Sequence, residues 1–105
     1  MDAPPAVIDR IRALLDGRAT DPRGVLTDVE HTLTDGYALA LELEGKCLRL
    51  GRRMADLTRT VERPEEAEQL RRLAAKLIET EAELSKLRVL LAELDRRRVS
   101  SRSAA

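Results

Sequence analysis

Apolar residues recur along most of this chain in steps of three and four, the spacing of a helix that buries one stripe of its surface. Between residues 26 and 61 the pattern has no break, so it forms a continuous heptad repeat. Its seam positions are Leu26, Val29, Leu33, Gly36, Ala40, Leu43, Cys47, Leu50, Met54, Leu57 and Val61. We therefore expect a long helix over about 25–61.

A second heptad repeat follows, out of phase with the first. Its seam positions are Leu70, Leu73, Leu77, Thr80, Leu84, Leu87, Leu91 and Leu94. Pro64 lies in the interruption, and a proline inside a helix costs about 3 kcal/mol. Glu65 and Glu66 follow it and favour a helix N-terminus. The sequence thus predicts a second long helix over about 64–98, separated from the first by a tight turn.

Two long helices of nearly equal length joined by a short turn are antiparallel neighbours. Folding the chain about Pro64 brings together seam positions whose numbers sum to 127. Every layer then joins an a position to a d position, as an antiparallel coiled coil requires. The layers include Leu50 with Leu77, Cys47 with Thr80, and Gly36 with Leu91. We expect an all-α fold, an antiparallel coiled-coil helical hairpin, in which the Cys47 thiol is buried.

A shorter amphipathic segment precedes the hairpin, over about 4–16. Gly17 is a suitable stop for this helix. Its apolar positions are Val7, Ile8, Ile11, Leu14 and Leu15. We expect it to pack on the open end of the hairpin, so that residues 1–98 form one helical domain. Residues 99–105 are polar and predict a disordered tail.

Two helices cannot bury all the apolar residues of the chain. Leu39 and Leu90 flank the seam near the open end, where the first helix can cover them, and Leu41 and Val89 near the same end are further candidates for this contact. Further apolar residues lie outside the stripe altogether: Leu41, Leu48, Ile78 and Val89. Exposed apolar surface of this extent is typical of an interaction site. We expect a homodimer or a complex with another helical protein, and the pattern leaves these two alternatives open.

The surface predicted for that partner lies at the middle and tip of the hairpin. Its residues are Leu41, Leu48, Gly51, Ala67, Ala74 and Ile78. In the proposed register Gly51 lies level with Ala74, and Ala67 lies one turn nearer the tip. Small side chains at these positions leave a shallow groove in which another backbone can approach.

Composition and charge narrow the class of function. The 105 residues include one aromatic side chain, Tyr37, and 36% are charged, which is typical of coiled coils. Nineteen basic residues balance nineteen acidic ones, unlike a dedicated nucleic-acid binder or a polybasic membrane-surface protein. No apolar run approaches the length of a membrane span. A single cysteine forms no internal disulfide, so we expect a reducing, cytoplasmic setting.

Residues that could carry chemistry are few. His31 is the only histidine and falls at an outer heptad position, without a second ligand at metal-binding spacing. Cys47 has no neighbouring base to activate it. The chain has no glycine-rich phosphate loop and no nucleophile motif. We therefore expect no catalytic residues, no metal and no cofactor, and hence a protein that is not an enzyme.

One short segment resembles a known family. Actinobacterial anti-sigma factors that bind cyclic di-GMP on a helical hairpin carry the motif Glu-x3-Ser-x2-Arg-x3-Gln-x3-Asp. Glu81, Ser85 and Arg88 match its first three positions, whereas Ala92 and Arg96 replace the glutamine and the aspartate. The first long helix has no copy of the motif, so the chain is not assigned to that family.

These patterns favour a non-enzymatic coiled-coil module that acts through protein–protein contact, as a subunit or adaptor of a larger assembly. The alternative is a small regulatory protein that sequesters a transcription factor, like an anti-sigma factor, with or without a small ligand. A neighbouring gene for a helical transcription factor would favour this alternative. A neighbouring operon for a large assembly would favour the first interpretation.

Overall fold

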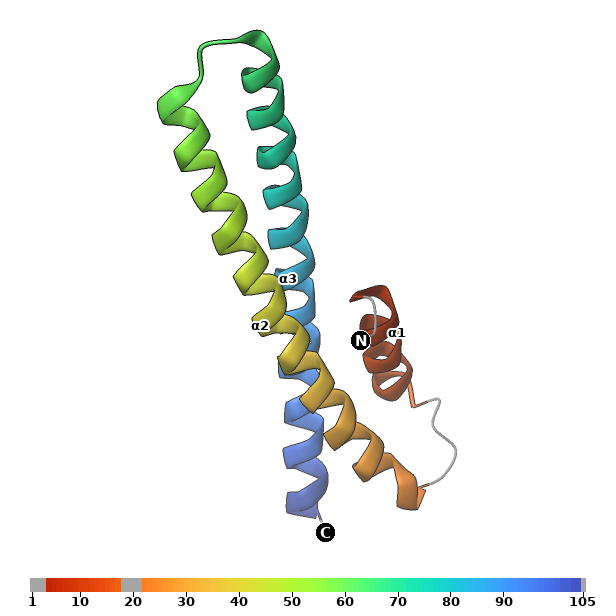
Figure 1. Cartoon of the computed structure of the whole chain (residues 1–105). Helices are drawn as coiled ribbons and strands as arrows, with labels where there is room; N and C mark the ends of the chain where they lie inside the picture. Colours follow the sequence, from red (N-terminus) through yellow and green to blue (C-terminus); the bar gives the residue numbers. More distant parts are fainter. Residues whose placement is uncertain (1–3, 18–21, 105) are drawn as a thin grey trace.

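The computed structural model describes residues 4–17 and 22–104, and its three helices form an elongated hairpin with a short third helix beside it (Figure 1). The helices are α1 (Pro4–Leu15), α2 (Pro22–Thr60) and α3 (Pro64–Ala104). The described residues contain no strand. The molecule measures 63 × 21 × 19 Å. The predicted all-α hairpin is confirmed.

Local signals explain where the helices begin and end. Each helix starts at a proline, because the first turn needs no backbone N–H from that residue. Gly17 ends α1 with a φ of 71°, a conformation that favours glycine. In the turn between α2 and α3, the carbonyl of Arg63 accepts hydrogen bonds from the N–H groups of Glu66 and Ala67, at 3.1 and 3.2 Å. These bonds close the first turn of α3.

Two helix bounds differ from the sequence prediction. The first long helix begins at Pro22, three residues earlier than expected, because the proline itself opens it. The second continues past residue 98 to Ala104, since neither glycine nor proline interrupts this polar stretch. The backbone of residues 99–104 is thus helical. The division of the chain into one domain and a disordered tail stays a prediction.

The register of the hairpin agrees with the layers deduced from the two heptads. At Gly36, a Cβ atom would overlap Cδ2 of Leu91 and lie 3.3 Å from its Cγ. Gly36 therefore faces Leu91 directly, and the absence of a side chain lets the leucine fill the layer. This contact supports the register in which paired seam positions sum to 127.

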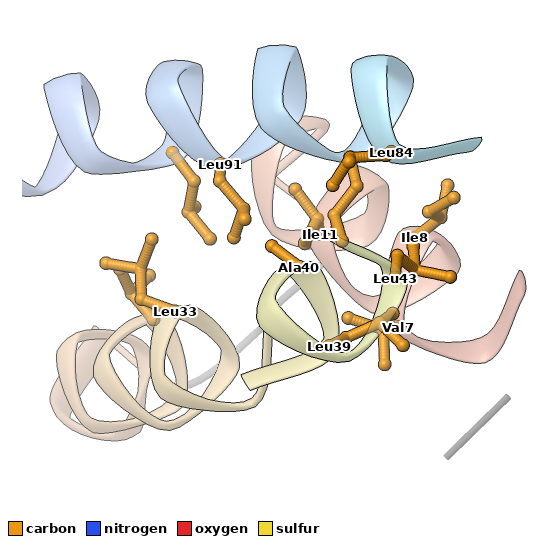
Figure 2. Packing of buried hydrophobic residues seen from close by; sticks show 12 residues of the cluster. Val7, Ile8, Ile11, Leu33, Leu39, Ala40, Leu43, Leu84 and Leu91 are labelled. Carbon is orange, nitrogen blue, oxygen red and sulfur yellow. The ribbon is translucent and has the colours of Figure 1, made fainter. Parts of the chain in front are cut away.

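The core lies at the open end, where α1 makes the hairpin a three-helix unit. Val7, Ile8 and Ile11 of α1 pack against both long helices, and Ile11 is fully buried. Figure 2 shows Ile11 behind Ala40, with Val7 beside Leu39. The buried residues of α2 and α3 in this cluster are Val29, Leu33, Leu39, Ala40, Leu43, Leu84, Leu87, Leu91 and Leu94. The expected packing of the short helix on the open end is confirmed.

Polar contacts hold α1 in place around this core. The guanidinium of Arg10 lies 3.0 Å from the carboxylate of Asp35 and 3.4 Å from the hydroxyl of Thr32, which is buried. At the C-terminal end of α1, Arg97 of α3 donates a hydrogen bond to the backbone carbonyl of Leu15. A cation at that position satisfies a carbonyl that has no partner within the helix.

Toward the tip the seam is less buried, because two helices surround each layer instead of three. Leu50, Leu73 and Leu77 are half-buried, whereas Leu87 at the open end has no exposed surface. Cys47 is also half-buried, so the prediction of a buried thiol is wrong. Its layer partner Thr80 is buried, and the Thr80 hydroxyl donates to the carbonyl of Lys76 at 2.7 Å. A two-helix layer with one small residue leaves the thiol within reach of solvent.

The outermost layers of the first heptad are not formed. Leu26 is 42% exposed and Val61, beyond the end of α2, is 38% exposed. Figure 1 shows the two long helices diverging toward the open end. The register places Leu26 opposite Ser101 and Val61 opposite Glu66, so neither has an apolar partner across the seam. The apolar seam therefore ends where the second heptad ends.

Candidate protein-binding face

The heptad positions divide the surface of the hairpin into two faces. At the coiled-coil repeat of 3.5 residues per turn, about 103° per residue, positions e and b lie about 75° and about 130° to one side of the seam, and g and c lie equally far to the other side. In an antiparallel pair the local two-fold axis is perpendicular to the layer of two helices. Positions b and e of both helices therefore share one face, which we call the b/e face, and positions c and g share the opposite c/g face.

The b/e face is rich in apolar and small side chains. On α2 its residues are Thr34, Tyr37, Leu41, Glu44, Leu48, Gly51, Ala55 and Thr58. On α3 they are Ala67, Arg71, Ala74, Ile78, Glu81, Ser85, Arg88, Ala92 and Asp95. Leu41, Leu48 and Ile78 are 68%, 62% and 68% exposed, and Tyr37 is 49% exposed. Because these large apolar side chains are mostly exposed, they contribute little to the core of the single chain.

Two adjoining hollows lie on the b/e face. The first, of about 380 Å³, is lined by Tyr37, Ala40, Leu41, Glu44, Arg88, Leu91 and Ala92. The second, of about 700 Å³, is lined by Glu44, Cys47, Leu48, Gly51, Arg52, Ala55, Leu77, Glu81 and Leu84. Glu44 borders both. The hollows form because the small b/e residues Gly51, Ala55 and Ala92 leave the seam leucines uncovered on this side.

The c/g face has the opposite character. At the open end α1 covers it, contacting the g positions through Arg10 with Thr32 and through Leu15 with Arg97. Beyond α1 the c and g positions of α2 are Glu42, Lys46, Arg49, Arg53, Asp56 and Thr60. Those of α3 are Glu65, Gln69, Arg72, Lys76, Glu79, Glu83 and Lys86. All of these are charged except Thr60 and Gln69, and none is apolar, so of the two faces only the b/e face has uncovered large apolar side chains.

An ion pair crosses the b/e face between the hollows. Glu44 of α2 is joined to Arg88 of α3, with 40% and 54% of the side chains exposed. The level register places Glu44 beside Glu81, a pair of like charges, but the Glu44 carboxylate turns toward Arg88 instead. A pair this exposed contributes only about 0–1 kcal/mol to stability. Its main effect is to neutralise the two charges nearest the apolar residues.

All six residues predicted for an interaction lie at b or e positions. Leu41, Leu48 and Gly51 line the hollows. Ile78 is exposed, and Ala67 and Ala74 are half-buried, but these three line neither hollow. The predicted set missed Tyr37, Ala55 and Ala92. A second series with three- and four-residue steps, running from Tyr37 to Ala55 on α2, would have found the first two.

Other candidate chemistry stays isolated. Cys47 borders the larger hollow, and His31 is exposed on α2. No group of three or more potential metal ligands occurs within residues 4–17 and 22–104. Over the same part of the chain, no helix is both long enough and apolar enough to cross a membrane. Comparison of the chain with protein-family models, curated proteins and solved structures finds no match.

Proposed function

We propose that this protein is a helical interaction module that acts by binding another helical surface through its b/e face. It serves as a subunit or adaptor of a larger assembly and catalyses no reaction. The single cysteine, which forms no internal disulfide, favours a cytoplasmic setting for this role.

The difference between the two faces carries the proposal. Both faces belong to the same two helices and have the same exposure to solvent beyond α1. A hairpin that functions alone would be expected to have charged residues on both faces. Instead the b/e face has exposed leucine and isoleucine, whereas beyond α1 the c/g face has only charged residues, a threonine and a glutamine. Apolar side chains concentrated on one face are typical of a surface that a partner covers.

The energies are sufficient for binding. Burying one leucine or isoleucine side chain contributes about 1.5–3 kcal/mol. Leu41, Leu48 and Ile78 together therefore offer about 5–9 kcal/mol, within the range of about 4–15 kcal/mol estimated for the freedom lost on association. Further contacts with Tyr37 and the hollows would supply the surplus. Gly51 has no atom within 4 Å of a Cβ built on it, so a partner helix can approach closely there.

Site-specific photo-crosslinking in cells tests the proposal. A photoreactive residue is placed at position 48 or 78 on the b/e face, or at the neighbouring position 49 or 79 on the c/g face as a matched control. All four native side chains are exposed, so the substitutions leave the fold intact. We expect protein adducts from positions 48 and 78 and none from positions 49 and 79. Equal adducts from all four, or none from any, would refute the proposed role of this face.

A further inference from the structure

We propose that the partner on the b/e face is a second copy of this chain, in a two-fold symmetric dimer. This inference rests on the proposed function and names its partner. The symmetry axis is perpendicular to the helices. It passes between the b/e face of one copy and the b/e face of the other, at the level of Leu48 and Ile78. Each α2 then lies antiparallel to α2 of the second copy, each α3 to its own counterpart, and the two hairpin tips point in opposite directions.

The level of the axis follows from the two most exposed apolar residues near mid-hairpin. In the hairpin register, Leu48 lies level with residue 79, one residue from Ile78, or about 1.5 Å along the axis. One axis can therefore place Leu48 against Leu48 of the second copy and Ile78 against Ile78 of the second copy. Both side chains are more than 60% exposed in the single chain and become central in the dimer.

The b/e face of α2 is complementary to itself about this axis. Facing positions have numbers that sum to 96. Leu41 meets Ala55 of the second copy, so a large side chain faces a small one on either side of the central leucines. Glu44 meets Arg52 of the second copy, which pairs opposite charges twice. All four residues border the hollows, so these contacts fill them.

The b/e face of α3 agrees with the same axis. Facing positions there sum to 156. Arg88 meets Glu68 of the second copy, again with opposite charges, and Glu81 meets Ala75. Shifting the register by one heptad toward the tip, so that facing positions sum to 149, would instead place Ile78 against Arg71. In the alternative dimer both hairpin tips point in the same direction, and each α2 lies on α3 of the second copy. Leu41 would then be level with Ser85 of the second copy, and Glu44 with Glu81. The arrangement with opposite tips is therefore the one that brings opposite charges together on both helices, Glu44 with Arg52 and Arg88 with Glu68.

The face is large enough for a stable dimer. In this register contacts extend from Tyr37 of one copy to Arg59 of the other, about 33 Å of helix. The hairpin is about 20 Å wide, close to its 21 Å principal extent. The projected face is thus about 660 Å², and its accessible surface is larger than that projection. A standard interface buries about 800 Å² per partner, roughly a ninth of the 7383 Å² exposed by this chain.

Sedimentation of the full chain tests the partner. We expect a dimer at about 100 µM, a concentration that populates even weak dimers. Leu48→Glu combined with Ile78→Glu should weaken association by about a hundredfold or more while circular dichroism stays unchanged. Arg49→Glu is the matched control, because Arg49 is exposed and follows Leu48 in the chain but lies at a c position, on the c/g face. A monomeric wild-type chain, or a dimer that survives the double substitution, overturns the inference.

Cysteine cross-linking tests the geometry in a Cys47→Ala background. With a short bismaleimide, Leu48→Cys should cross-link to itself across the axis. Leu41→Cys alone should not, since its two copies lie about 21 Å apart along the helices, but mixed with Ala55→Cys it should. Cross-linking only in a mixture of Leu48→Cys with Ile78→Cys would overturn the proposed axis in favour of tips together.

Photo-crosslinking separates failure of this inference from failure of the proposed function. Adducts at positions 48 and 78 that contain only this chain support the dimer. If the chain sediments as a monomer and these adducts contain a different helical protein, the interaction module stands and the self-partner is refuted. If the b/e face gives no adduct of either kind, both proposals fail.

Discussion

The sharpest test of the hairpin register is the substitution Gly36→Ala. Gly36 is buried in α2 against Leu91 of α3, which is only 2% exposed. An added methyl group would overlap one terminal carbon of Leu91 and crowd its Cγ. The methyl group cannot be accommodated without moving Leu91, and Leu91 is itself enclosed by the core of the open end.

Two effects of opposite sign determine the stability change. Replacing glycine by alanine inside a helix stabilises it by about 1 kcal/mol. Overpacking a core layer costs about 1–3 kcal/mol. We therefore expect Gly36→Ala to lower the free energy of unfolding by about 1 kcal/mol, in contrast with the usual gain. For a chain of this size that lowers Tm by about 4–8 °C.

Gly45→Ala is the matched control in the same helix. The nearest atom to its new Cβ is a guanidinium nitrogen of Arg49 at 3.2 Å, at the end of an exposed, flexible side chain. This variant should gain the full stabilisation of about 1 kcal/mol that alanine has over glycine in a helix, and so raise Tm by about 4–8 °C. Both variants are measured by thermal and urea unfolding at one protein concentration.

A double-mutant cycle completes the test. Leu91→Ala alone should cost about 2–5 kcal/mol through the cavity that it leaves. In the Gly36→Ala background the same change should cost less, because the alanine methyl group occupies part of that cavity. If Gly36→Ala stabilises the chain as much as Gly45→Ala does, and the two changes at 36 and 91 are additive, Gly36 does not face Leu91 and the register is wrong.

Three further outcomes follow from the distribution of burial. Ile11→Ala should destabilise the chain by about 2–5 kcal/mol in urea unfolding, whereas Val99→Ala, at an exposed site, should change stability by less than about 0.5 kcal/mol. Leu87→Ala should cost clearly more than Leu77→Ala, because Leu77 lies in a half-buried two-helix layer; equal costs would contradict the burial gradient. At a protein concentration low enough to keep the chain monomeric, the Cys47 thiol should react with a thiol reagent in the native state faster than global unfolding permits, and a rate limited by unfolding would show that it is buried after all.

The hairpin could be predicted from the sequence because two independent heptads had to agree. The first and second seams are fixed by their own leucines, and only one fold about Pro64 pairs them without a mismatch. The contact between Gly36 and Leu91 is a consequence of that register. Helix starts at prolines were similarly readable, since proline opens a helix for a local reason.

Burial was less predictable, because it depends on how many helices surround a layer. Cys47 and Leu87 occupy equivalent seam positions, yet the thiol is half-buried and the leucine is fully buried. The heptad pattern predicts which side chains point toward the seam, but it does not predict how far α1 extends along the hairpin. α1 ends before the Cys47 layer. The side of the hairpin covered by α1 was also not deduced, since Leu39, Leu41, Val89 and Leu90 were all plausible contacts. Only Leu39 and Leu90 lie on the covered side.

The position of α1 explains why the b/e face stays free along the whole hairpin. Val25, Leu39 and Leu90 are the apolar residues at c or g positions of α2 and α3 outside the last turn of α3, and all three lie near the open end. They provide the c/g face with just enough apolar surface for one short helix. Arg10 and Arg97 then hold that helix through contacts to Asp35 and to the carbonyl of Leu15. With α1 committed to the c/g face, no helix within residues 4–17 and 22–104 covers Leu41, Leu48 and Ile78, and this supports the proposal that a second copy of the chain covers them.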